Sequence, residues 1–210
     1  ALRRRHRPRR LWWSLPCTYW CSWTALNYAG PERQQILEDH RRRERRLLWH
    51  AHVFIAEALQ EDPDLLIYFE WPYPCYGWSQ KPLLAIQALL RRHGQEWLDC
   101  RIDGCRYGMV DENQDFLRKK WLVKTNDEHF HSEYHCKVCH GGHSHGRIEG
   151  RETQKSAYYP WKMVQSFARF WAKQTVSTQQ LRRMNFHEVN EVEDFDLYAA
   201  PEDDEVYKEI

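Results

Sequence analysis

Five side chains of metal-ligand type lie between positions 136 and 145. They are Cys136, Cys139, His140, His143 and His145. A Cys-x-x-Cys-His spacing followed by two glycines is typical of a tight turn that presents thiolate and imidazole groups to one zinc ion. Cys100 and Cys105 are candidate partners from a neighbouring strand end. We predict a structural zinc site with a ligand set such as Cys105, Cys139, His143 and His145, and with Cys136 as the main substitute.

Two other interpretations of this stretch stay open. Cys-x-x-Cys-His is also the attachment pattern of c-type haem, and histidines can gather in a polar surface loop by chance. We favour zinc because the histidines at 143 and 145 exceed what haem attachment requires. A closed zinc site would also staple a loop that has too few apolar residues to hold itself.

A second candidate is the thiol of Cys17, within the sequence Ser14-Leu-Pro-Cys-Thr. The apolar stretch at 11–15 predicts a strand that ends at Pro16, which would place the thiol at the rigid edge of a sheet. Backbone N–H groups of the following loop could stabilise a nucleophilic thiolate there. Packing among the nearby tryptophans is the alternative, because cysteine is among the most buried residue types.

A third candidate is the carboxyl group of Glu70, at the end of the apolar run 64–70. A carboxyl group in such a place costs free energy unless it is paired or takes part in chemistry. It could donate a proton next to Cys17. Pairing with an arginine and capping of a neighbouring loop are the alternatives.

Basic and aromatic side chains could serve a nucleic acid. The basic candidates for a phosphate groove are Arg101, Arg106, Arg118, Lys119 and Lys120. The aromatic candidates for stacking on an extruded base are Trp71, Tyr73, Tyr76 and Trp78. The basic residues could equally form an ordinary solvated face, and such aromatic side chains more often pack in cores and loops.

Strands and helices alternate along the chain and would position these groups. The apolar patterns predict strands at 11–15, 64–70, 96–102 and 119–125, and helices at 31–60, 79–94 and 158–172. Residues 126–150 read as a loop. This order predicts an α/β fold with a mainly parallel sheet, which binds ligands beyond the carboxyl ends of its strands. Cys17, Glu70 and Cys105 each follow or end a predicted strand.

Composition excludes several classes of protein. With 31 Lys and Arg against 30 Asp and Glu, the net charge of +1 excludes a uniformly basic nucleic-acid coat and a uniformly acidic disordered chain. No apolar run approaches the roughly 20 residues of a membrane helix. The seven cysteines and the absence of a leader pattern predict free thiols in an intracellular compartment. Residues 1–10 are basic and residues 176–210 are largely acidic, so we expect mobile tails there.

Two motifs resemble those of carbon-5 cytosine DNA methyltransferases, most closely the phage-type branch. The stretch SLPCT at 14–18 is similar to the family's Pro-Cys nucleophile motif, and FEWP at 69–72 is similar to its Glu-Asn-Pro motif. The stretches CRYG at 105–108 and KKWL at 119–122 follow in the family's order. The likeness covers about residues 10–126. The whole chain also resembles segments of eukaryotic retroelement-like polyproteins.

The resemblance implies the second half of a doubly wound, Rossmann-like methyltransferase sheet. We therefore expect a methyltransferase-like α/β domain at 11–175, into which the predicted zinc loop, the His/Cys-rich stretch 129–150, is inserted. The resemblance also implies DNA as the partner and S-adenosylmethionine as the methyl donor. It further implies that Cys17 attacks carbon 6 of an extruded cytosine while Glu70 contacts ring nitrogen 3. The sequence contains no glycine-rich S-adenosylmethionine loop before Cys17, so we expect no methyl transfer from these 210 residues alone.

Two alternatives come from other functional classes. The first is a zinc-stabilised module of a mobile-element protein that binds nucleic acid or protein without catalysis. The second is a cysteine hydrolase that pairs Cys17 with His140 or His143, although no spacing places a histidine beside Cys17. DNA as the partner would fit a nuclear location, and a polyprotein origin would add further modules as partners.

Overall fold

The computed structural model describes residues 8–175. The chain divides into two compact units, residues 1–166 and 167–210, and the sheet with both candidate sites belongs to the first unit. The predicted basic tail enters this description only from Pro8, and its last residue, Arg10, already begins a strand. The predicted acidic tail at 176–210 lies outside the described residues.

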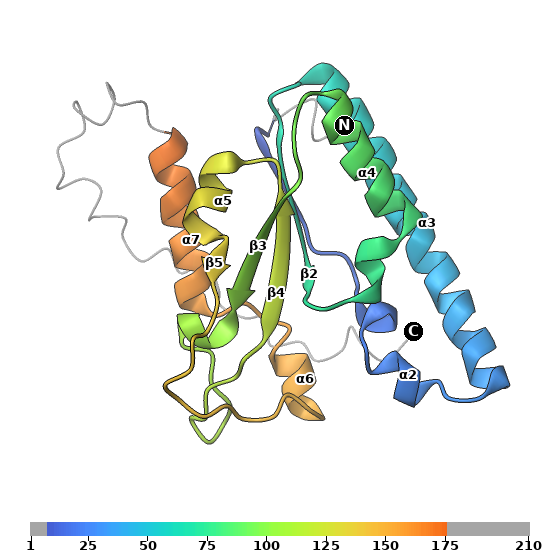
Figure 1. Cartoon of the computed structure of the whole chain (residues 1–210), viewed down its shortest axis with the longest axis vertical. Coiled ribbons are helices and arrows are strands. Elements are labelled where there is room, and N and C mark those ends of the chain that lie inside the picture. The colour runs from blue at the N-terminus through green and yellow to red at the C-terminus, as the bar shows by residue number, and fades with distance from the viewer. Residues whose placement is uncertain (1–7, 176–210) are drawn as a thin grey trace, which may run out of the picture. The chain divides into compact units, whose positions relative to one another are not determined.

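Five strands form one sheet in the order β1-β2-β4-β3-β5 (Figure 1). They are β1 (Arg10–Trp13), β2 (Leu66–Pro72), β3 (Leu98–Asp103), β4 (Lys120–Thr125) and β5 (Cys136–Lys137). β4 runs antiparallel to β2 and to β3, whereas β1 is parallel to β2 and β5 is parallel to β3. The sheet is therefore mixed, which corrects the prediction of a mainly parallel sheet. Periodicity of apolar residues does not reveal strand direction.

Helices and 3-10 turns connect most of the strands in the sequence and also follow the last strand. The helices are α2 (Thr24–Asn27), α3 (Pro31–Glu61), α4 (Lys81–Arg92), α5 (Glu128–Tyr134), α6 (Arg151–Lys155) and α7 (Trp161–Thr175), with 3-10 turns η1 (Thr18–Trp20), η2 (Tyr76–Ser79) and η3 (Gly104–Tyr107). The predicted helices at 31–60 and 79–94 correspond closely to α3 and α4. Pro31 begins α3 because a proline at the first helical position loses no hydrogen bond. None of the described helices has the length and apolar composition that crossing a membrane requires.

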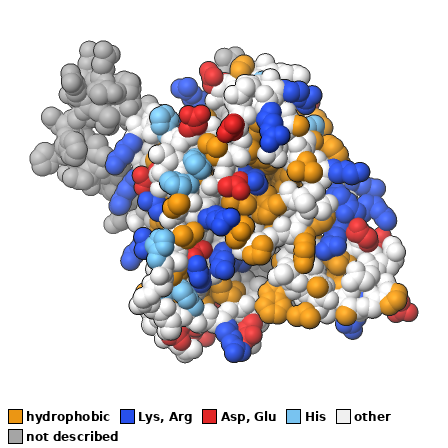
Figure 2. Space-filling model, viewed as in Figure 1, with side chains coloured by type: hydrophobic (Ala, Val, Ile, Leu, Met, Phe, Trp, Pro, Cys, Tyr) orange, Lys and Arg blue, Asp and Glu red, His pale blue; other side chains and the backbone are white. Residues whose placement is uncertain are grey.

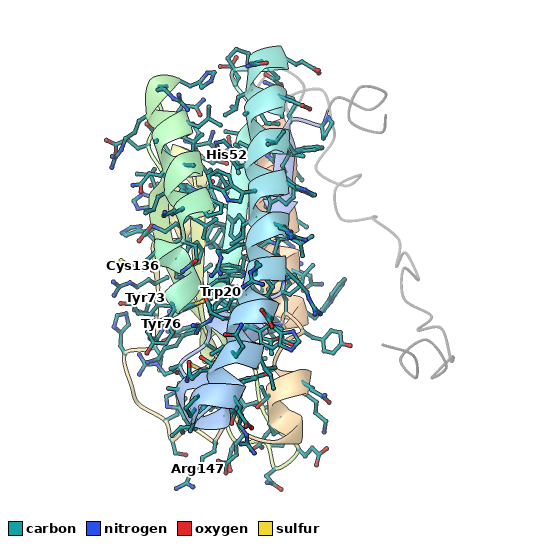
Figure 3. The ribbon with its side chains drawn as sticks, turned by 90° about the vertical axis from the view of Figure 1, so that its right-hand side faces the viewer. Trp20, His52, Tyr73, Tyr76, Cys136 and Arg147 are labelled. Carbon is teal, nitrogen blue, oxygen red and sulfur yellow. The ribbon has the colours of Figure 1, made fainter. Side chains whose placement is uncertain are left out.

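The two faces of the sheet bury different side chains. Ile67, Phe69 and Trp71 of β2 pack in one apolar core with side chains of α3 and α4, which lie side by side in Figure 3. Because side chains alternate along a strand, Tyr68 and Glu70 point to the opposite face. There the ring of Tyr68 contacts Phe130 of α5, with ring centroids 5.1 Å apart. The central strand therefore carries Glu70 on the face away from α3 and α4.

The predicted loop at 126–150 contains a helix and a strand that sequence analysis missed. The Asp127 carboxylate accepts a hydrogen bond from the backbone N–H of Phe130 and caps α5. Only Phe130 and Tyr134 of α5 are buried, which is too short a pattern for helical periodicity to be recognised. β5 has two residues, Cys136 and Lys137, and gives no strand signal of its own.

The four strands that share one direction end at the same edge of the sheet, which we call the carboxyl edge. Cys17 follows β1 at this edge, Glu70 lies near the end of β2, Cys105 follows β3, and Cys139 follows β5. Lys119 precedes β4, whose antiparallel direction brings its start to the same edge. Cys17, Glu70, Cys105, Lys119 and Cys139 thus lie at one edge of the sheet.

Candidate metal centre and the Cys17–Glu70 site

Four ligand-type side chains meet at the carboxyl edge. They are Cys105, Cys139, His143 and His145, and one ligand atom from each lies within 4.8 Å of the others. The Cys139 sulfur is 3.6 Å from Nε2 of His143 and 3.6 Å from Nε2 of His145. This group could hold a metal ion, and it is the ligand set that the sequence predicts.

The parallel pairing of β3 with β5 brings the two cysteines together. Cys105 lies in η3, directly after β3, and Cys139 lies two residues after β5. Gly141 and Gly142, with φ angles of 92° and 87°, then turn the chain back so that the histidines face Cys139. Residues other than glycine rarely adopt this backbone conformation with positive φ, which explains why two glycines stand directly before His143.

A buried carboxylate fixes the position of Cys139. Oδ2 of Asp103 accepts hydrogen bonds from the backbone N–H of Cys139 at 2.9 Å and from Nε of Arg118 at 2.8 Å. Arg118 also donates to the carbonyl oxygen of Cys139 at 3.2 Å. Arg118, a candidate phosphate ligand in the sequence, is therefore engaged with the cysteine loop. A carboxylate next to a ligand backbone in this way orients the ligand.

Cys136, the predicted substitute ligand, lies outside the cluster. It is exposed and pairs with Arg101 in the register between β5 and β3. Cys100, considered as a partner, is fully buried within β3, where burial raises the pKa of its thiol to about 12. His140 is exposed and is not part of the cluster either. All seven cysteines are free of disulfide bonds in the structure.

The thiol of Cys105 is neutral at ordinary pH when no metal is bound. Burial, together with the adjacent Cys139 thiol, raises the pKa of Cys105 to about 11. A metal binds the thiolate form of cysteine, so loading of this cluster must release the proton of Cys105.

Cys17 lies at the carboxyl edge and also packs against the apolar core. Its side chain is half-buried beside the core of α3 and α4. Burial raises the pKa of the Cys17 thiol to about 11, and the negative charge of Glu70 adds to this effect while Lys119 opposes it. The thiol is therefore neutral near pH 7. Cys17 therefore lies at the sheet edge, as a nucleophile would, and also packs against the core, as a structural cysteine would.

Among the described residues, two hydroxyl groups and no cation contact the carboxyl group of Glu70. Its side chain is 5% exposed. Oε2 accepts hydrogen bonds from the Tyr159 hydroxyl at 2.5 Å and from the Ser14 hydroxyl at 2.8 Å. Burial raises the pKa of Glu70, although these two hydrogen bonds and the charge of Lys119 oppose the rise. Within residues 8–175 no basic group lies at ion-pair distance, so pairing with an arginine does not explain this carboxyl group.

The predicted phosphate-binding residues differ in what they contact. Arg106 and Lys120 are exposed at the carboxyl edge, in η3 and at the start of β4. The guanidinium of exposed Arg101 lies 4.4 Å from the centroid of the Tyr73 ring. Lys119 is half-buried, and its positive charge lowers the pKa of Cys17 and of Glu70 against the effect of burial. Figure 2 shows basic side chains on the face that carries the ends of β2 and β3.

Two of the four aromatic candidates for base stacking belong to the core. Trp71 is 1% exposed and donates its indole N–H to the carbonyl oxygen of Leu15. Trp78 packs against Trp71, with ring centroids 5.7 Å apart. Tyr76 is exposed, and half-buried Tyr73 is stacked under Arg101. The stacking interpretation therefore fails for the buried ring of Trp71. Trp78 is half-buried against the core, and Tyr73 and Tyr76 remain candidates.

Sequence analysis missed three residues that hold the candidate groups. Asp103 stands at the end of an apolar strand, as Glu70 does, and this parallel could have revealed it. Ser14 lies three residues before Cys17 in a motif that was recognised for the cysteine alone. Tyr159 is 89 positions away from Glu70 and carries no sequence signal for that contact.

No family model, curated protein or solved structure matches the chain. By its fold, the chain is an α/β domain with a mixed five-stranded sheet. By its sites, it combines a cluster of two cysteines and two histidines that could hold a metal ion with a buried carboxyl group near a thiol at one edge.

Proposed function

We propose that this chain is a nucleic-acid-associated, methyltransferase-like domain that receives an extruded pyrimidine base at Cys17 and Glu70. One observation carries the proposal: a buried carboxyl group without a cationic partner lies within electrostatic reach of a thiol at the carboxyl edge. Such a carboxyl group is costly for stability, and costly, perturbed groups of this kind cluster at functional sites. The edge is also where open α/β sheets bind their ligands.

Glu70 can read the edge of a cytosine ring in its neutral form. A neutral carboxyl group offers one hydrogen-bond donor and one acceptor. Cytosine presents an acceptor at ring nitrogen 3 and a donor at its amino group, so the two edges are complementary. The raised pKa of Glu70 supports this role because burial favours the neutral form.

Cys17 supplies the thiol that would add to carbon 6 of the ring. Because its pKa is about 11, the thiol must lose its proton to solvent as the sulfur–carbon bond forms. The positive charge of Lys119 favours this loss, since it lowers the pKa of Cys17 against the effect of burial. The resulting negative charge on the ring is quenched when carbon 5 takes up a proton.

S-adenosylmethionine, the methyl donor that the resemblance implies, finds no fitting loop among the described residues. The connection from β1 to α3 contains one glycine, Gly30, and the connection from β2 to α4 also contains one, Gly77. Within residues 8–175 the one glycine-rich connection from a strand to a helix is that from β5 to α6, with Gly141, Gly142, Gly146 and Gly150. It lies far after Cys17 in the chain, and it carries the metal-ligand cluster. We derive no methyl-transfer step and expect none from this chain alone.

A zinc ion bound by Cys105, Cys139, His143 and His145 would stabilise the structure of the carboxyl edge. For tetrahedral zinc, bond lengths of about 2.3 Å to sulfur and 2.0–2.1 Å to nitrogen give a sulfur–nitrogen separation of about 3.6 Å. Both separations from Cys139 to the histidines are 3.6 Å. Two thiolates and two imidazoles also leave no open position, as is typical of a structural site.

Covalent capture on DNA tests the function. A single-stranded oligonucleotide that contains one 2-pyrimidinone base can accept the thiol, with net addition of S–H across its carbon 5–carbon 6 double bond and no methyl donor. We expect a denaturant-resistant adduct that maps to Cys17, that is lost in Cys17→Ser and that forms far more slowly in Glu70→Ala, which leaves no hydrogen-bond donor for ring nitrogen 3. An intact chain that forms no adduct at any pH up to 9 would refute the proposal.

The second candidate function is a zinc-stabilised binding module without catalysis, within a retroelement-like polyprotein. The neutral state of Cys17 and its packing against the core favour it. Under this alternative, Cys17→Ser and the unaltered chain would bind DNA equally and neither would form an adduct. DNA affinity that falls as salt rises, with Arg106→Ala and Lys120→Ala each reducing the salt dependence, would support an interface at the carboxyl edge.

A further inference from the structure

A tyrosine from a distant part of the chain lies directly over Glu70. The Tyr159 ring meets Trp12 and Trp121 edge-on, with ring centroids 6.1 Å and 5.7 Å away. Its hydroxyl donates to Oε2 of Glu70 at 2.5 Å and lies 3.2 Å from the Ser14 oxygen. A planar ring with a hydrogen-bond donor thus already occupies the space between two tryptophans and the candidate carboxyl group.

The segment that carries Tyr159 is tied to the sheet by side chains. The backbone hydrogen bonds of residues 156–160 all go to partners within four positions along the chain, such as Ser156 to Glu152 and Met163 to Pro160. The neighbours of Tyr159 reach into solvent: Tyr158 is 80% exposed and Trp161 is 63% exposed. Withdrawal of the Tyr159 ring would therefore break no strand pairing and no long-range backbone hydrogen bond in the described part of the chain.

We propose that Trp12, Trp121, Ser14 and Glu70 form a binding site for a planar ring that bears a hydrogen-bond donor, and that Tyr159 closes this site until such a ring displaces it. The ligand class, an extruded nucleobase, rests on the proposed function. The site itself rests on the contacts of Tyr159, which show that the walls accept an aromatic ring edge-on and that the carboxyl group accepts its donor. Edge-to-face contacts of this kind are favourable geometries for aromatic rings.

Filling the vacated site with a free ring tests the first part. In Tyr159→Ala, p-cresol should bind and raise the melting temperature, and it should bind at least tenfold more tightly than toluene, which has no donor for Glu70. The unaltered protein and Tyr158→Ala, which removes an exposed neighbour, should show no such shift. Equal affinity for p-cresol and toluene, or no binding of either, would overturn the ring site.

Competition with substrate tests the second part, and it uses a variant that keeps the ring. Tyr159→Phe removes only the hydroxyl group, with its hydrogen bonds to Glu70 and Ser14, so it remains informative even if Tyr159→Ala does not fold. The rate of 2-pyrimidinone capture at Cys17 should rise between about twofold and tenfold, the range that one such hydrogen bond contributes. An unchanged or slower rate would overturn the closing role of Tyr159.

The two readouts separate this inference from the proposed function. Binding of p-cresol to Tyr159→Ala, without capture by any variant, would support the ring site and refute the nucleobase as its ligand. Capture by the unaltered chain, without p-cresol binding to Tyr159→Ala, would support the proposed function and refute the ring site.

Discussion

At the scale of single residues, Cys139 is the side chain on which the metal cluster depends most. Its sulfur is the atom that contacts both histidines. Cys139→Ser should abolish metal binding and lower the melting temperature strongly, because a structural metal contributes its binding free energy to folding. Metal content by mass spectrometry, combined with thermal melting before and after chelation, measures both effects.

Cys136→Ser is the matched control for this change. Cys136 lies three positions earlier, is exposed and stands outside the cluster. It should retain one metal per chain and the melting temperature of the unaltered protein. Metal loss in Cys136→Ser, or unchanged melting in Cys139→Ser, would contradict the ligand set.

Asp103 should set the affinity of the cluster without touching the metal. Asp103→Asn weakens the hydrogen bonds to Arg118 and to the backbone of Cys139. Loss of an orienting carboxylate of this kind typically reduces metal affinity by about 10–100-fold. Competition with a coloured chelator measures the change.

Asp99→Asn is the control for Asp103, because Asp99 lies on the same strand and forms an ion pair with Lys124 at the surface. It should leave metal affinity unaltered, since exposed ion pairs contribute little. Similar losses in the two variants would mean that the charge of β3, and not the hydrogen bonds of Asp103, controls the cluster.

The four members of the cluster could be predicted from the sequence because Cys139, His143 and His145 are closely spaced and Cys105 follows a predicted strand that ends at the same edge. It could not reveal Asp103 or Tyr159 as partners. A hydrogen bond between residues 36 or 89 positions apart depends on the packing of the whole sheet, and no local pattern reports it. The Cys-x-x-Cys spacing makes Cys136 a plausible substitute in the sequence, but its pairing with Arg101 of β3 keeps it out of the cluster.

At the scale of elements, α3 carries a carboxyl group on its buried side. Glu44 is 8% exposed, and burial raises its pKa to about 7. Above its ordinary pKa the unfolded chain releases this proton while the folded chain still binds it, so stability falls as pH rises from about 4.5 to 7. Glu44→Gln should remove this loss and stabilise the fold above pH 7 by up to about 3 kcal/mol.

Denaturant unfolding at pH 4.5 and pH 8 measures the pH effect. Glu57→Gln, on an exposed position of the same helix, is the control and should follow the unaltered protein at both pH values. Parallel pH profiles for Glu44→Gln and the unaltered chain would show that Glu44 is charged in the folded state.

The elements could be predicted to different depths. α3 and α4 have long apolar faces and end at Asp-Pro and glycine signals, so their bounds were recognisable. The direction of β4 was not, because an apolar run reads the same for parallel and antiparallel strands. β5 could not be predicted at all, since two residues become a strand only where a neighbour offers free backbone groups.

At the scale of the molecule, a metal ion bound by Cys105, Cys139, His143 and His145 would join the ends of β3 and β5. Cys105 and Cys139 are 34 positions apart, and a cross-link over such a loop removes about 4 kcal/mol of chain entropy from the unfolded state. Chelation should therefore loosen this side of the sheet first. Amide hydrogen exchange should rise in residues 104–107 and 136–146, while β2 keeps its protection until global unfolding.

A uniform rise in exchange across the sheet after chelation would contradict this prediction. It would mean that the cluster and the core of α3 and α4 unfold as one cooperative unit. Cys136→Ser serves again as the control, because its exchange pattern should match that of the unaltered chain.

The strand order also has a consequence for synthesis on the ribosome. β2 and β3 follow one another in the sequence but are not neighbours, because β4 lies between them. When residues 1–110 have left the exit tunnel, three of the strands are exposed, yet only β1 and β2 can pair with each other. β3 must wait with its backbone groups unpaired until β4 has left the exit tunnel, and during that interval its apolar residues are open to chaperones and to neighbouring nascent chains.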